Sequence, residues 1–121
     1  MAKSDALKSH IEALRSAIPE LQGVLLASTE GLPIAHSLAN GADPNRVAAM
    51  AAAASSLGRR ITDSINAGNC GEVSVRGEEG VLFVYAAGSK AVLAVVGPES
   101  GNAGLIHIEA RNTAKDIGEL F

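Results

Sequence analysis

The chain has 121 residues, of which 47% are hydrophobic and 19% are charged, and its formal net charge is −3. This length and composition predict one globular domain over residues 1–121 and exclude a disordered chain. The ten Lys and Arg residues are scattered, and only one Tyr and two Phe accompany them. The chain therefore lacks the basic, aromatic surface that nucleic-acid binding needs.

A single cysteine, Cys70, excludes an intrachain disulfide and a cysteine-rich metal site. The first ten residues carry charges where a signal peptide would have its apolar core. The apolar runs are shorter than the ~20 residues of a membrane-spanning helix. We therefore expect a cytoplasmic protein without a membrane span.

The first predicted element is a helix that ends at Pro19, and its apolar residues repeat at helical spacing: Leu7, Ile11, Leu14 and Ile18. A β-hairpin follows, with strands at residues 23–28 and 32–37. Gly31 lies in its turn, where a positive φ is needed.

Asp43 and Pro44 predict the start of a long helix that runs to about residue 66, because an acidic N-cap followed by proline is typical of a helix N-terminus. Three strands follow, at residues 70–76, 81–86 and 91–96. A last helix over residues 102–121 completes the order αββαβββα.

The strand patterns predict where each strand lies in the sheet. Residues 24–27, 81–86 and 91–96 are continuously apolar, so these strands are expected to be buried on both faces, with helices on both sides of the sheet. Pro33 places its strand at an edge, because proline cannot donate a ladder hydrogen bond. Residues 72–76 alternate in polarity and contain no proline, which indicates a second edge that remains open to pairing.

The front half of the long helix, residues 47–54, is apolar on all sides, which indicates cover on two sides. A helical projection places one stripe against the helix's own sheet: Val47, Met50, Ala54, Leu57, Ile61 and Ile65. The opposite face carries small residues: Ala48, Ala49, Ala52 and Ser56.

We expect this small-residue face and the open strand to form the interface of a homodimer, the strand contributing Glu72, Val73, Ser74, Val75 and Arg76. Small residues let two helix backbones approach closely. The alternative is an alanine-rich surface helix that reflects helix propensity alone.

Several segments together resemble the Roadblock/LC7 family: residues 18–26 (IPELQGVLL), 28–35 (STEGLPIA), 47–52 (VAAMAA), 81–85 (VLFVY), 91–96 (AVLAVV) and 102–106 (NAGLI). The resemblance covers about residues 7–121. It implies an α/β (α+β) sandwich of the profilin-like and longin-like kind, with a five-stranded antiparallel sheet. The central helix would cover one face, and the two terminal helices would cover the other.

The resemblance also implies homodimers that join the central helices and the third strands of two copies. Members of the family are regulators or scaffolds of Ras-like small GTPases, or dynein light chains. We therefore expect a non-enzymatic adaptor that binds such a GTPase in signalling or cell polarity, acting as a GTPase-activating protein or as a scaffold.

The chain has no pattern for chemistry of its own. It lacks GxxxxGK[ST] and GxGxxG, and none of its three histidines has the neighbours of a catalytic or metal site. We therefore expect no catalytic residue, no cofactor and no metal. Cys70 has two possible roles. It is a small apolar structural residue, or it lies near the Cys70 of the second copy in a dimer.

Arg59, Arg60 and Asp63 are the candidates for partner contact. An arginine finger is one interpretation, and an ion pair between Arg59 and Asp63 at i,i+4 is the other. A rival function is a small-ligand sensor with a profilin-like or PAS-like sandwich, which would require a cavity lined by convergent polar side chains. A small enzyme is a third alternative.

Overall fold

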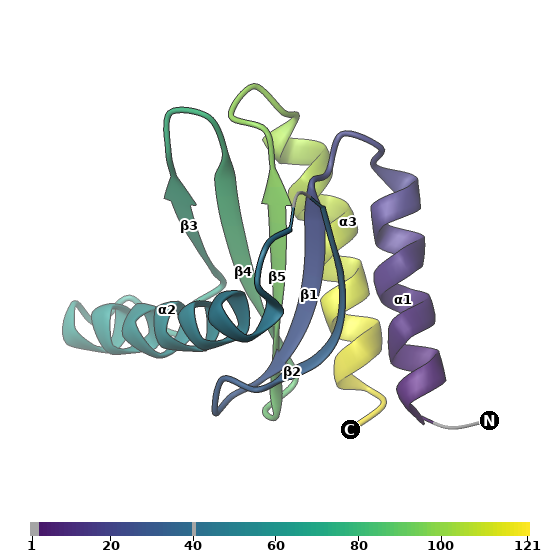
Figure 1. The fold of residues 1–121 in the computed structure, drawn as a ribbon. Coiled ribbons are helices and arrows are strands. Elements are labelled where there is room, and N and C mark those ends of the chain that lie inside the picture. The colour runs from purple at the N-terminus through teal and green to yellow at the C-terminus, as the bar shows by residue number, and fades with distance from the viewer. Residues whose placement is uncertain (1–2, 40) are drawn as a thin grey trace.

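The computed structural model describes residues 3–39 and 41–121 and has the predicted order αββαβββα. Figure 1 shows the arrangement of these elements. In chain order they are α1 (Lys3–Ala17), β1 (Gly23–Ser28), β2 (Pro33–Leu38), α2 (Pro44–Ser64), β3 (Glu72–Arg76), β4 (Val81–Ala87), β5 (Ala91–Gly97) and α3 (Ala103–Gly118).

The strands form one antiparallel sheet in the order β2-β1-β5-β4-β3. The three continuously apolar strands, β1, β5 and β4, are central, as predicted. Their register places Leu25 beside Ala94 and Val84 beside that same Ala94 on its other side. Both predicted edges are confirmed: β2, which begins at Pro33, and β3.

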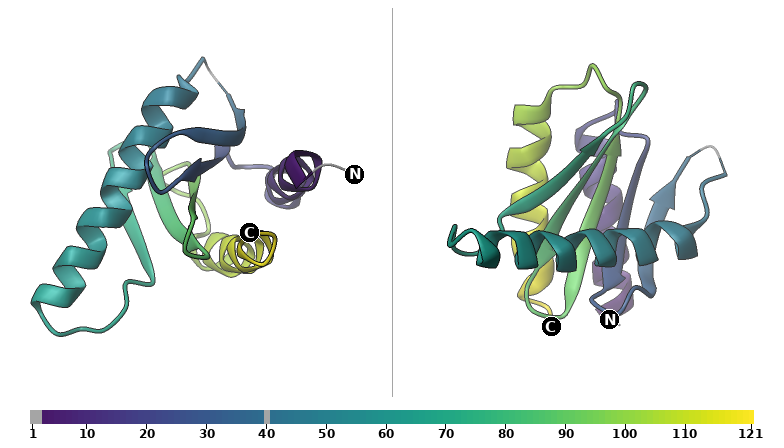
Figure 2. Two further views of the ribbon diagram at one scale, coloured as in Figure 1. Left: turned by 90° about the horizontal axis from the view of Figure 1, so that it is seen from below. Right: turned by 90° about the vertical axis from the view of Figure 1, so that its left-hand side faces the viewer.

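Helices cover both faces of the sheet, with α2 on one face and α1 and α3 on the other (Figures 1 and 2). The core under α1 and α3 is built from large aliphatic and aromatic side chains, among them Ile11, Leu26, Tyr85, Leu93 and Ile117. The core under α2 is smaller and alanine-rich: Leu25, Ala27, Ala48, Ala51, Val84, Val92 and Ala94. The fold class predicted from the sequence is therefore confirmed.

The start of α2 follows the predicted signal. The Asp43 carboxylate accepts a hydrogen bond from the main-chain N–H of Asn45 at 3.0 Å, and Pro44 occupies the first turn. The helix ends at Ser64, slightly earlier than predicted, and Asn66 then adopts a φ of 56°. None of the helices within the described ranges is long and apolar enough to cross a membrane.

The structure corrects the predicted orientation of α2. The residues that face its own sheet are the small ones, Ala48, Ala51, Ala52 and Gly58, with Ala48 0% and Ala52 8% exposed. Of the stripe predicted to pack there, Val47 and Ala54 do pack against the core under α2. Its other members are exposed: Met50, Leu57, Ile61 and Ile65.

The physical reason is the close approach that small residues permit between the α2 backbone and the sheet. The prediction placed the larger side chains of α2 against the sheet. In the structure, the larger side chains of this core come from the sheet itself, namely Leu25, Val84 and Val92. In addition, α2 crosses the strands and its C-terminal end extends past the edge strand β3 (Figure 1). Residues near the helix end therefore have little sheet beneath them.

Candidate interaction surface

Among the described residues, several large apolar side chains of α2, its C-cap and β3 are between 50% and 66% exposed. We call them the α2–β3 patch: Met50, Leu57, Ile61, Ile65 and Val75. Val75 belongs here because it lies two residues beyond Val73, whose side chain packs into the core under α2. Single exposed apolar residues are ordinary, but a series along one helix marks an interaction surface.

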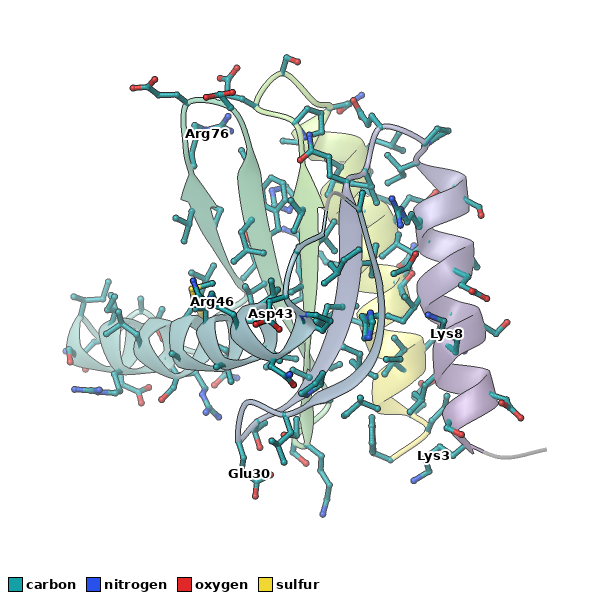
Figure 3. The ribbon with its side chains drawn as sticks, in the orientation of Figure 1. Lys3, Lys8, Glu30, Asp43, Arg46 and Arg76 are labelled. Atoms are coloured by element: carbon teal, nitrogen blue, oxygen red, sulfur yellow. The ribbon has the colours of Figure 1, made fainter. Side chains whose placement is uncertain are left out.

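Strand β3 forms the edge of the sheet beside this patch, and no other strand of the described residues pairs with its outer side. Within the described residues, the side chains of β3 form ion pairs near the two ends of the strand. The Arg76 guanidinium lies 3.5 Å from the Glu99 carboxylate, and the Arg111 guanidinium lies 2.8 Å from that of Glu72. Figure 3 shows Arg76 at the far end of β3. The main chain of β3 thus remains open to another strand.

The opposite edge, β2, is occupied by side chains of α1. The Lys8 ammonium group donates a hydrogen bond to the main-chain carbonyl of His36, and the Arg15 guanidinium donates to the Ser37 hydroxyl at 2.8 Å. Figure 3 shows Lys8 on α1. Pro33 also removes one ladder donor from this strand. The two sheet edges therefore differ in their capacity to pair.

The residues predicted for a dimer interface occupy different positions in the structure. Ala49 and Ser56 are exposed on α2, whereas Ala48 and Ala52 are buried against the chain's own sheet and cannot present a surface. On β3, the residues Ser74, Val75 and Arg76 are exposed, and Glu72 and Val73 are half-buried. The large residues of α2 thus replace its alanines as the candidate contact residues.

The three residues predicted to contact a partner are all exposed, but they do not form one cluster. Arg60 lies beside Leu57 and Ile61 of the α2–β3 patch. Arg59 and Asp63 border a separate hollow next to Cys70 and Ser89. The ion pair expected between Arg59 and Asp63 is not among those that residues 3–39 and 41–121 form. The side chain of Arg59 is therefore not held by its neighbour one turn on.

Sequence reasoning missed a partly buried pair of polar side chains on the other face of the sheet. The Tyr85 hydroxyl of β4 lies 2.6 Å from Nδ1 of His107 on α3, and Phe83 meets the His107 ring edge-on at 4.8 Å. Burial raises the pKa of the Tyr85 hydroxyl far above its ordinary value; the Glu72 carboxylate raises it further, and Arg111 opposes this. Tyr85 is therefore neutral and joins α3 to β4.

No signal in the sequence marks this pair, because the contact depends on how α3 packs on the sheet. The described parts of the chain contain no group of three or more His, Cys, Asp or Glu placed to hold a metal ion.

Comparison with known proteins supports the fold. The model of the Roadblock/LC7 domain family matches residues 10–97. An uncharacterized protein of Methanocaldococcus jannaschii is 31% identical over 101 residues, which is 84% of this chain and 88% of that protein.

Two solved structures are closely similar. The Roadblock/LC7 domain from Streptomyces avermitilis has a TM-score of 0.84 and 25% identity, covering 91% of this chain and 92% of that one. MglB of Myxococcus xanthus has a TM-score of 0.88 and 16% identity, covering 100% and 91% of the two chains. At that identity, the MglB likeness concerns the fold alone.

Proposed function

Because this chain belongs to the Roadblock/LC7 domain family, we propose that it is a cytoplasmic, homodimeric adaptor that binds a Ras-like small GTPase. The observation that carries the proposal is the α2–β3 patch beside an open sheet edge. The GTPase is inferred from the family, whose members include regulators and scaffolds of Ras-like GTPases as well as dynein light chains. The chain would act by binding rather than by catalysis.

A second copy of the chain is the partner that fits both features of this surface. A two-fold axis beside β3 would pair β3 with its counterpart and place the two α2 helices against each other. Burying a half-exposed Leu, Ile, Met or Val side chain contributes about 1 kcal/mol, and the symmetry doubles the number of such side chains. The Lys8 contact and Pro33 disfavour β2 as the pairing edge.

The dimer is tested by molar mass from size-exclusion chromatography with light scattering. The wild-type chain is expected to have twice the mass of the 12.2 kDa monomer. Ile61→Glu is expected to give a folded monomer, because it places a charge in the patch without disturbing the core. Ile108→Glu is the matched control, since Ile108 is also exposed, at 60% against 50% for Ile61, but lies on α3, across the sheet. A dimeric Ile61→Glu variant would contradict the proposed interface.

For the GTPase, we propose that the adaptor favours one conformation of the switch regions and so shifts the nucleotide state. Arg59, Arg60 and Asp63, at the exposed end of α2, are the proposed contact residues on each copy. Their charges are available, because none of them forms an ion pair within the described ranges.

A pulldown with the Ras-like GTPases of the source genome, loaded with GDP or with a non-hydrolysable GTP analogue, tests this step. We expect binding that depends on the nucleotide and that Arg60→Glu weakens. Binding that is equal in both states, or absent from both, would contradict a regulatory role, even if the dimer is found.

A further inference from the structure

A cavity of about 100 Å³ lies between α2 and the ends of strands β3, β4 and β5. Val73, Val84 and Val92 belong to its apolar walls, and its lining also includes polar side chains: Thr29, Ser55, Arg59, Cys70 and Ser89. The cavity continues into the hollow beside Asp63, with which it shares Arg59, Cys70 and Ser89. These shared residues therefore lie at the opening of the cavity.

Several polar side chains at this cavity reach solvent and make no hydrogen bond within the described residues, where no buried side-chain nitrogen or oxygen lacks a partner. Within residues 3–39 and 41–121, neither the Arg59 guanidinium nor the hydroxyls of Thr29, Ser55 and Ser89 form a hydrogen bond to the protein through the side chain. The Cys70 thiol is engaged with the main-chain carbonyl of Glu72 at 3.7 Å.

The charge at the cavity favours an anion. Glu72 also borders it, but its carboxylate is engaged by Arg111 at 2.8 Å. Asp63 lines the outer hollow and not the cavity itself. Arg59 is thus the one cationic side chain in the lining, and three hydroxyls accompany it. A cation with several neutral donors is the arrangement that satisfies an oxyanion inside a partly apolar site.

The volume limits the size of the ligand. A cavity of 150 Å³ holds a molecule as large as benzene, so a cavity of about 100 Å³ fits a group of about five non-hydrogen atoms. Phosphate and sulfate have that size, and a nucleoside does not.

We propose that this cavity binds a small inorganic oxyanion, held by Arg59 and by the hydroxyls of Ser55, Thr29 and Ser89. The site shares Arg59 with the proposed GTPase contact, but phosphate binding is measured on the chain without a GTPase, so the two proposals can fail separately. An oxyanion bound there would make the adaptor responsive to a small ligand. The reason is that Glu72 and Val73, the first residues of the proposed pairing strand β3, border the same cavity.

The test is a titration of the isotope-labelled wild-type chain with inorganic phosphate, followed by amide NMR shifts, with sodium chloride of equal ionic strength as the reference. We expect saturable shifts at the residues around the cavity at millimolar phosphate. Arg59→Gln is expected to weaken binding about tenfold, because it removes a charge-assisted hydrogen bond. Arg60→Gln is the matched control and is expected to leave phosphate binding unchanged, since Arg60 does not line the cavity.

Shifts that do not saturate, or equal weakening by both substitutions, would overturn the site. Glycerol 2-phosphate distinguishes the free ion from a phosphate ester. Weaker binding of the ester is expected from the volume of the cavity, and equal binding would overturn the assignment to a free inorganic ion. Circular dichroism of each variant verifies that the fold is intact.

Discussion

Gly58 of α2 lies against Val73 of β3 so closely that a Cβ atom on Gly58 would be 2.5 Å from Cγ2 of Val73 and 3.0 Å from Sγ of Cys70. This contact sets the distance between the helix and the edge strand. Because Val is β-branched, its side chain has few alternative rotamers into which it can withdraw. The α2–β3 spacing thus depends on one missing methyl group.

We therefore predict that Gly58→Ala destabilises the protein by about 1–3 kcal/mol, although alanine is the better helix former. Urea unfolding at a fixed chain concentration measures the change. Gly104→Ala on α3 is the control, since its added Cβ would meet nothing closer than 3.5 Å. That variant is expected to be slightly stabilised, by about 0.5 kcal/mol. A stabilised Gly58→Ala variant would contradict the close contact.

A second prediction concerns the C-terminal end of α3. A Cβ atom on Gly118 would be 2.7 Å from the main-chain nitrogen of Gly88, which adopts a φ of 70° in the β4–β5 turn. Main-chain atoms cannot move away from an added Cβ atom as easily as the end of a flexible side chain can. Gly118→Ala is therefore expected to lower the free energy of unfolding by about 1–3 kcal/mol. Equal stability of the variant and the wild-type chain would show that the helix end shifts freely.

The orientation of α2 gives a third prediction. Ala52 is 8% exposed and faces the sheet, so Ala52→Glu would bury a charge without a partner. We expect it to cost about 2–4 kcal/mol and to reduce the yield of folded protein. Thermal unfolding compared with that of Ile61→Glu measures the difference. A well-folded monomer from Ala52→Glu would restore the orientation first expected from the sequence.

A fourth prediction follows from Tyr85. Its folded-state pKa is raised by burial, so the folded chain holds this proton more tightly than the unfolded chain. The resulting stability is fully present below the unfolded pKa of about 10 and is lost as the pH rises above it. For this group alone, we expect a loss of about 1 kcal/mol between pH 10 and pH 11.

Urea unfolding of wild type and Tyr85→Phe at pH 8, 10 and 11 isolates that contribution, because both chains share all other titrating groups. At pH 8 the variant should be less stable by about 1 kcal/mol, from the lost hydrogen bond to His107. At pH 11 the difference should vanish. A constant difference across the three pH values would mean that Tyr85 ionises with equal ease in both states.

The sequence predicts which strands are central and which are edges, because polarity patterns report burial directly. Continuous apolar runs identified the central strands, and Pro33 identified one edge. The orientation of α2 could not be predicted in this way, since a helix apolar on all sides has no polar face to mark its outside. The size of a side chain was a poor guide, because Gly58 and the alanines provide close approach rather than bulk.

The candidate site was predictable only in outline. The open edge of β3 followed from its alternating pattern, but the exposed residues of the patch depend on how far α2 extends past the sheet. The polar cavity depends on Thr29, Ser55 and Ser89, which lie in three separate segments. No local pattern connects such residues before the chain has folded.

The difference between the two borders of the sheet also limits growth. A sheet with two free borders can add copies at both ends and lengthen into a ribbon, the route by which edge strands lead to fibres. Here the Lys8 ammonium group engages the β2 main chain and Pro33 removes one ladder donor, which disfavours the addition of a further strand at β2. A lysine on a neighbouring helix thus helps to protect this edge strand from further pairing.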